Sequence, residues 1–124
     1  MLAADGVLRL TTPNLDRLIG MYRGDLQPTG EALLDHHRKF HGRPVADLCT
    51  WFNDHMHEWG HQYLYDRPAL DRALASAGFA DRRECAFGQS SDPDLVGVER
   101  HDEGVAWMRT AYLLIVEARK ARPA

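Results

Sequence analysis

The segment that most constrains the fold is Ala111–Val116, whose sequence AYLLIV is apolar on both faces of an extended chain. An apolar run of this length is typical of a strand that is covered by other layers on each side. Helices must supply those layers, so the segment predicts an α/β fold. The charged residues from Glu117 to Ala124 predict a tail after the strand.

Two more segments have the character of strands. Val7–Thr12 is apolar and β-prone, and Pro13 follows it without the N–H that a central ladder requires. Arg82–Phe87 alternates in polarity, which predicts a half-buried or edge strand. Together with Ala111–Val116, these segments predict a sheet of three strands.

About four helices are expected between and around these strands. The first begins at Asn14 and ends near Gly20 or Tyr22, and the second is capped by Thr29 and ends at Lys39 or His41 before Gly42. The third runs from about Val45 to Trp59. The fourth follows the N-cap Asp66 and ends at Gly78.

The third helix is expected to be strongly two-sided. One side carries an apolar stripe at helical spacing, namely Val45, Leu48, Cys49, Phe52, Met56 and Trp59. The other side carries a polar array made of Thr50, Asp54, His57 and His61, flanked by Asn53 and Glu58. On the preceding helix, His36, His37 and His41 are expected to face solvent.

The residues His57-Glu58-Trp59-Gly60-His61 match the pattern H-E-x-x-H. On a continuous helix this pattern brings two imidazoles to one metal ion and leaves the carboxylate to act on bound water. Gly60 lies inside the motif and weakens the helix that would hold both ligands. The segment also lacks the further histidine of a longer zinc-protease signature.

Size and composition exclude several classes of protein. The 124 residues suffice for one domain spanning residues 1–124, and the net charge of −3 without a basic stripe argues against a nucleic-acid surface. No apolar run is long enough to span a membrane. Cys49 and Cys85 are not in a C-x-x-C motif, which favours two buried free thiols in a cytoplasmic protein.

Several motifs, taken in order, resemble those of the C-terminal half of a class I S-adenosylmethionine-dependent methyltransferase. Residues 4–14 (ADGVLRLTTPN) are similar to the family's P-G-G-x-L-x-L-x-x-P-[DN] passage. Residues 60–66 (GHQYLYD), followed by Leu70, Leu74 and Ala77-Gly78-Phe79, resemble the G-H-x-x-x-Y-D … L … L … A-G-F signature of a bacterial subgroup.

The resemblance implies a partial Rossmann-like fold with a three-stranded mixed sheet, equivalent to the family's strands five, six and seven. The last strand should lie antiparallel beside the first. Residues 85–90 (CAFGQS) and Ala111–Lys120 correspond to the sixth and seventh strands. The family's glycine-rich cofactor loop is absent, so no cofactor-binding residue is assigned. The chain is expected to be a truncated form that is inactive alone.

In such enzymes the region after the fifth strand and the inserted helices form the acceptor side of the cleft. The resemblance therefore implies acceptor binding by Thr12, Asn14, Asn53 and His57. It also implies that His61 and Tyr65 take a proton from the acceptor hydroxyl or orient it. The competing interpretation is that His61 and Tyr65 make local hydrogen bonds that fix the bend into the next helix.

Two other classes of function stay open at this point. One is a zinc-dependent hydrolase using His57, Glu58 and His61, and the other is a non-catalytic module that dimerises. No resident metal is assigned. Loss of the neighbouring strand would leave Val7–Thr12 with an unpaired edge, which predicts a homodimer or higher oligomer through this strand or by exchange of the N-terminal segment.

Overall fold

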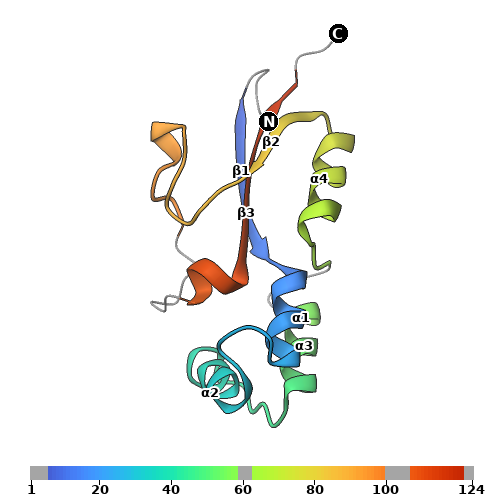
Figure 1. Cartoon of the computed structure of the whole chain (residues 1–124), viewed down its shortest axis with the longest axis vertical. Coiled ribbons are helices and arrows are strands. Elements are labelled where there is room, and N and C mark those ends of the chain that lie inside the picture. The colour runs from blue at the N-terminus through green and yellow to red at the C-terminus, as the bar shows by residue number, and fades with distance from the viewer. Residues whose placement is uncertain (1–5, 59–62, 100–106, 122–124) are drawn as a thin grey trace.

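A computed structural model describes residues 6–58, 63–99 and 107–121. In these ranges three strands form one sheet, β1 (Val7–Pro13), β2 (Phe79–Glu84) and β3 (Leu113–Lys120). The order is β1-β3-β2, so the last strand occupies the centre (Figure 1). Both neighbouring pairs are antiparallel.

The expectation of a mixed sheet was therefore wrong. A mixed sheet needs at least one pair of neighbouring parallel strands. Since β1 and β2 are each antiparallel to β3, they run in the same direction, but β3 separates them. The expectation that the last strand lies antiparallel beside the first was confirmed.

Four α-helices occur in the described residues, as predicted, together with two short turns of other helical types. They are α1 (Leu15–Arg23), α2 (Gly30–His41), α3 (Leu48–His57), α4 (Arg67–Ser76), the 3-10 turn η1 (Pro93–Leu95) and the π-helical turn η2 (Met108–Tyr112). No helix in these ranges is long and apolar enough to cross a membrane.

Local capping explains where the helices begin. The side chains of Asn14, Asp47 and Asp66 accept hydrogen bonds from the backbone N–H groups of Asp16, Thr50 and Ala69, in α1, α3 and α4 respectively. These bonds satisfy donors that have no partner within the helix. Gly24 and Gly42 end α1 and α2 with positive φ angles of 87° and 63°, which glycine adopts without steric cost.

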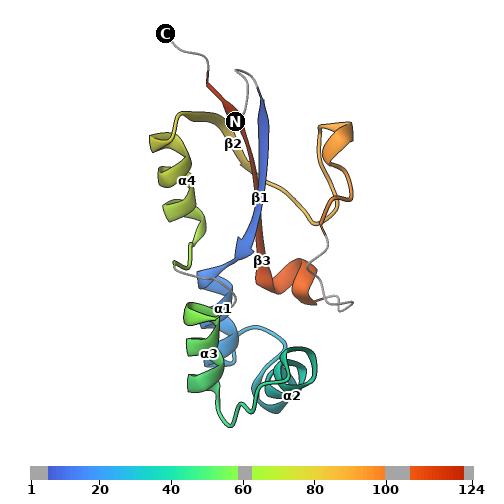
Figure 2. The same cartoon turned by 180° about the vertical axis from the view of Figure 1, so that it is seen from behind.

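The sheet has helix α4 on one side and the segment that contains η1 on the other (Figures 1 and 2). Alternate residues of β3, namely Leu114, Val116 and Ala118, pack with Leu70 and Leu74 of α4. The helices α1, α2 and α3 gather at one end of the sheet, where a second apolar cluster includes Leu18, Leu33, Trp51 and Tyr112. The molecule is consequently elongated.

Both later strands differ from their predicted bounds. β2 begins at Phe79 and ends at Glu84, earlier than the predicted Arg82–Phe87, because Gly78 turns the chain directly from α4 into the sheet with φ 88°. β3 continues through Glu117 to Lys120, so the predicted charged tail was wrong for these residues. Glu117 is buried in the strand because ion pairs compensate its charge.

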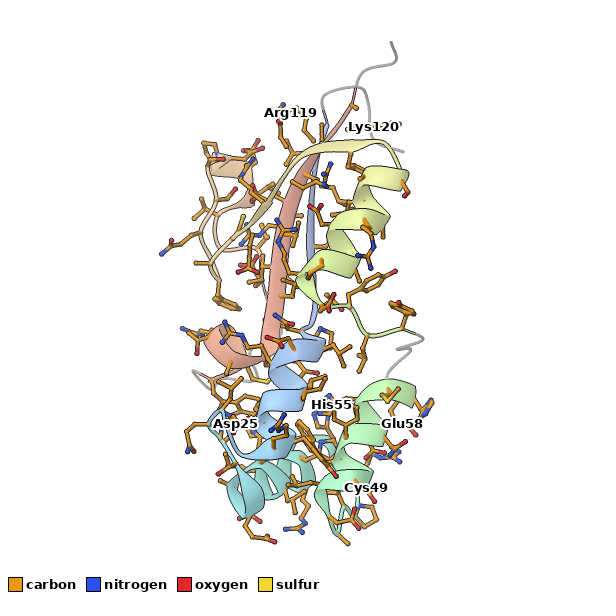
Figure 3. The ribbon with its side chains drawn as sticks, turned by 45° about the vertical axis from the view of Figure 1, so that its right-hand side comes forward. Asp25, Cys49, His55, Glu58, Arg119 and Lys120 are labelled. Atoms are coloured by element: carbon orange, nitrogen blue, oxygen red, sulfur yellow. The ribbon has the colours of Figure 1, made fainter. Side chains whose placement is uncertain are left out.

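The predicted apolar stripe on α3 was only partly right: Val45, Leu48 and Phe52 belong to or pack against the cluster at the helical end, but the most buried face lies elsewhere. Trp51, Asp54 and His55 are the buried residues of this helix, whereas Cys49 is exposed and Met56 is 40% exposed. Figure 3 shows His55 between α1 and α3, and Cys49 and Glu58 on the outer side of α3. Packing against α1 and α2 selects a face that includes polar side chains with buried partners.

Candidate functional site

A cleft of about 510 Å³ lies at the end of the sheet where β1 and β2 finish and β3 begins. Its walls come from the residue after β1, the first turns of α1, the segment after β2, and η2. The lining residues are Asn14, Arg17, Glu84, Cys85, Ala86, Phe87, Arg109, Thr110 and Leu113. This volume suits a small molecule.

Backbone and side-chain hydrogen bonds hold Asn14 in the cleft wall. Its backbone N–H donates to the Tyr112 carbonyl at 2.9 Å, and its side-chain oxygen accepts from the Asp16 N–H at 3.2 Å. The next residue, Leu15, donates its N–H to the Tyr65 carbonyl at 2.9 Å. Asn14 is only 9% exposed. These bonds fix the turn from β1 into α1 and with it the orientation of the first helical turn.

That helical turn presents Arg17, three residues after Asn14, to the same cleft. The side chain is half-buried. It makes no ion pair or hydrogen bond to any residue in the described ranges.

The opposite wall combines an aromatic ring with a second cation. The Arg109 guanidinium carbon lies 5.0 Å from the centre of the Phe87 ring, a cation–π distance. The backbone of this wall is tied to the sheet, because the Cys85 N–H donates to the Ile115 carbonyl at 2.8 Å and the Ala86 carbonyl accepts from Arg9 at 3.2 Å.

A buried ion network stabilises the segment that carries Phe87. Arg9 of β1 and Arg83 of β2 both lie opposite Glu117 of β3, and each pairs with it at 2.6 Å. Arg9 also pairs with Glu99, whose other oxygen accepts from the Gly88 N–H at 2.7 Å. The side chains of Arg9, Glu99 and Glu117 are 3%, 1% and 0% exposed.

Burial and hydrogen bonding act in opposite directions on the carboxyl groups of this network. Burial favours their neutral form, but hydrogen bonds from Ser90 and Arg9 to Glu117, and from Arg9 and Gly88 to Glu99, favour the charged form. The hydrogen bonds prevail, so the pKa of each carboxyl lies below its ordinary value. The pKa of Arg9 is raised, because its bonds to both carboxylates outweigh its burial.

A second buried polar network lies among the helices. His37 Nε2 is 3.0 Å from Asp54 Oδ2, and Arg43 donates to both Asp54 oxygens at 3.1 and 3.2 Å. The expectation that His37 faces solvent was wrong, since it is 1% exposed. Burial lowers the pKa of His37. Burial would raise the pKa of Asp54, but hydrogen bonds from His37 and Arg43 outweigh it and lower that pKa.

The helical end is connected to the cleft through Tyr112. The Tyr112 hydroxyl lies 2.9 Å from His55 Nδ1 on α3, and its carbonyl accepts the Asn14 N–H. Tyr112 is buried, as is His55. Tyr112 of η2 therefore links the packing of α3 to the position of the cleft residue Asn14.

The predicted site residues do not all meet. Asn14 lines the cleft, and the backbone of Tyr65 bonds to its neighbour, but the Tyr65 ring packs with the cluster between α4 and the sheet. Thr12 alternates with Leu8 and Leu10, so it belongs to the α4 face. Asn53 and His57 are exposed on α3. His61 lies outside the described residues.

The H-E-x-x-H segment is not carried by one continuous helix. α3 ends at His57, and Glu58 is already extended with φ −99° and ψ 170°. The Glu58 carboxylate lies 3.3 Å from Arg43. Trp59 and His61 fall outside the described residues. Within the described ranges, no three side chains of the metal-binding types gather in one group.

The cleft residues that sequence reasoning missed are Arg17, Phe87 and Arg109. A signal existed for Arg17, because a residue three positions after an N-cap lies on the same side of the first helical turn. No local sequence pattern predicts that Phe87 and Arg109 lie in the same cleft as Arg17, since they come from distant segments of the chain. Both cysteines are free thiols, as expected, but Cys49 is exposed and Cys85 half-buried.

The fold and the cleft define an α/β protein with an antiparallel three-stranded sheet and a small-molecule-sized cleft at its helical end. Comparison of the chain with protein-family models, with curated proteins and with solved structures returned no match.

Proposed function

We propose that this chain forms the acceptor-substrate side of an S-adenosylmethionine-dependent methyltransferase, and that it does not bind the cofactor by itself. The observation that carries the proposal is the cleft at the end of β1, which contains Asn14 of the motif that resembles the family's fifth strand. The antiparallel placement of the last strand beside β1, which the resemblance implies, gives further support.

The described residues do not fit S-adenosylmethionine. Its sulfonium group is a cation, and the cleft is lined by two guanidinium groups, those of Arg17 and Arg109. Like charges at close range are repulsive. The single carboxylate among the described lining residues is Glu84, which is exposed. The cofactor is therefore assigned to residues outside this cleft, and no step of the reaction is derived through it.

The proposal can be tested with the gene. The genomic DNA that flanks the region encoding this chain should encode a segment in which a strand is followed by a G-x-G-x-x-G-like loop and a helix. Co-expression of that segment with this chain should give a complex that transfers tritiated methyl groups from S-adenosylmethionine to cell-extract metabolites. Absence of such a segment, or transfer that is equally fast without this chain, would contradict the proposal.

We also propose that the chain associates with a second copy through β1. This strand lies at one edge of the sheet, and in the described ranges it pairs with β3 alone. An open edge of seven residues offers a row of backbone donors and acceptors to another strand. A cytoplasmic location remains part of the proposal, since free thiols are typical of a reducing compartment.

A further inference from the structure

The strongest unexplained feature of the cleft is the guanidinium group of Arg17. It carries five N–H donors, is half-buried, and has no ion pair or hydrogen bond to any described residue. A partly desolvated cation that lacks an acceptor is unfavourable by itself. Most of the other arginines in these ranges contact a carboxylate, so the exception at the cleft points to an acceptor that binds from outside.

The charge of the cleft fits the same acceptor. Arg109 adds a second guanidinium group from a different element, η2, whereas Glu84 is the one carboxylate among the described lining residues. The nearby acidic residues form ion pairs elsewhere: Glu99 with Arg9, and Glu117 with Arg9 and Arg83. Among the described lining residues, two guanidinium groups therefore accompany a single, exposed carboxylate.

The rest of the lining suits a flat organic molecule. Phe87 and Leu113 offer apolar surface, and the Arg109 guanidinium stacks over the Phe87 ring. Planar guanidinium groups stack on aromatic faces and form paired hydrogen bonds with carboxylates. Asn14 and Thr110 add polar groups that can orient a ligand.

We infer that this cleft binds a small organic anion with a carboxylate and a planar apolar body, and that Arg17 holds the carboxylate. The binding site is inferred from the cleft alone. Its identification as the place where the methyl acceptor binds rests on the proposed function.

The test uses benzoate as the probe and benzamide as its uncharged analogue of the same shape. Benzoate should cause saturable shifts in the amide NMR signals of Arg17, Phe87 and Arg109 in the full chain. Benzamide should bind at least about tenfold more weakly, because it lacks the charge that strengthens hydrogen bonds from a guanidinium group. Arg17→Gln should weaken benzoate binding by a similar factor. Its fold should be retained because Arg17 has no described partner to lose.

Arg23→Gln is the matched control, since Arg23 lies on the same helix but is exposed and pairs with Asp25 at 3.7 Å. This variant should bind benzoate as the unmodified chain does. Equal binding of benzoate and benzamide, shifts that persist in Arg17→Gln, or no saturable shift would overturn the inference. Inorganic phosphate binding as tightly as benzoate would also overturn it, because no planar body would then be required. Benzoate binding without methyl transfer by the co-expressed complex would leave the site intact and reject the proposed function.

Discussion

Substitution of Arg9 by methionine tests the most buried charge network of the protein. Methionine keeps an unbranched apolar side chain in place and removes the guanidinium group, with its bonds to Glu99, Glu117 and the Ala86 carbonyl. Glu99 would lose its ion pair with Arg9, whereas Glu117 would keep Arg83 at 2.6 Å. The Glu99 carboxylate then stays buried with the Gly88 N–H but without Arg9, and breaking a buried pair by removing one partner costs about 3–5 kcal/mol.

Protonation sets an upper limit on this cost. A glutamate with an ordinary pKa of about 4.3 can be protonated at pH 7 for about 3.7 kcal/mol, since each pH unit corresponds to about 1.36 kcal/mol. The folded variant would take up this proton rather than hold the buried Glu99 charge without Arg9. We therefore expect Arg9→Met to lose about 3–4 kcal/mol of unfolding free energy at pH 7.

Urea unfolding measures this loss directly. With a slope of about 1–3 kcal/mol per molar urea, typical of small proteins, the midpoint should fall by roughly 1–4 M. Because the variant takes up a proton on folding, its deficit should shrink by about 1.4 kcal/mol per pH unit between pH 7 and about pH 4.3. The control is Arg119→Met on the same sheet, where the side chain is 46% exposed and pairs with Asp81 at 3.7 Å. An exposed pair is worth about 0–1 kcal/mol. A deficit for Arg9→Met no larger than the control's, or one that does not change with pH, would refute the reasoning.

Three further predictions concern pH, assembly and metal. Because the pKa of His37 is lowered, the unfolded chain binds a proton first as the pH falls below about 6.5, so the melting temperature should begin to decrease there. The lowered pKa values of Glu99 and Glu117 should add a second, steeper decrease below about pH 4.3, and a melting temperature that is flat from pH 7 to 3 would contradict both assignments. Light scattering at micromolar concentration should give at least twice the chain mass if β1 pairs with a second copy, whereas a monodisperse monomer would exclude that association. Metal analysis of chelator-free protein should return well below one zinc per chain, both for the unmodified protein and for Glu58→Gln. The reason is that α3 ends at His57 and that Arg43 contacts the Glu58 carboxylate. One zinc per chain in both proteins would favour the hydrolase alternative.

The sequence predicted those parts of the fold that local interactions determine. The starts of α1 and α4 follow from side chains that cap the adjacent N–H groups, and the ends at Gly42 and Gly78 follow from backbone angles that favour glycine. The inward side of α3 could not be predicted in this way. Asp54 is buried because His37 and Arg43 surround it, and both come from outside that helix.

The same distinction applies to β3 and to the cleft. Glu117 reads as the start of a charged tail because its partners Arg9 and Arg83 are far away in the sequence. Asn14 could be predicted because the segment that contains it resembles a family motif. Arg109 and Phe87 become cleft residues only when η2 and the segment after β2 meet beside α1.

The central claim is that this chain supplies the acceptor side of a methyltransferase and leaves the cofactor to other residues. Titration calorimetry with S-adenosylhomocysteine, on this chain alone and on its complex with the co-expressed glycine-rich segment, tests it most directly. The claim predicts no binding tighter than about millimolar for the chain alone and a dissociation constant near micromolar for the complex, a gain of about 4 kcal/mol. Micromolar binding by the chain alone, or no binding by the complex, would contradict it.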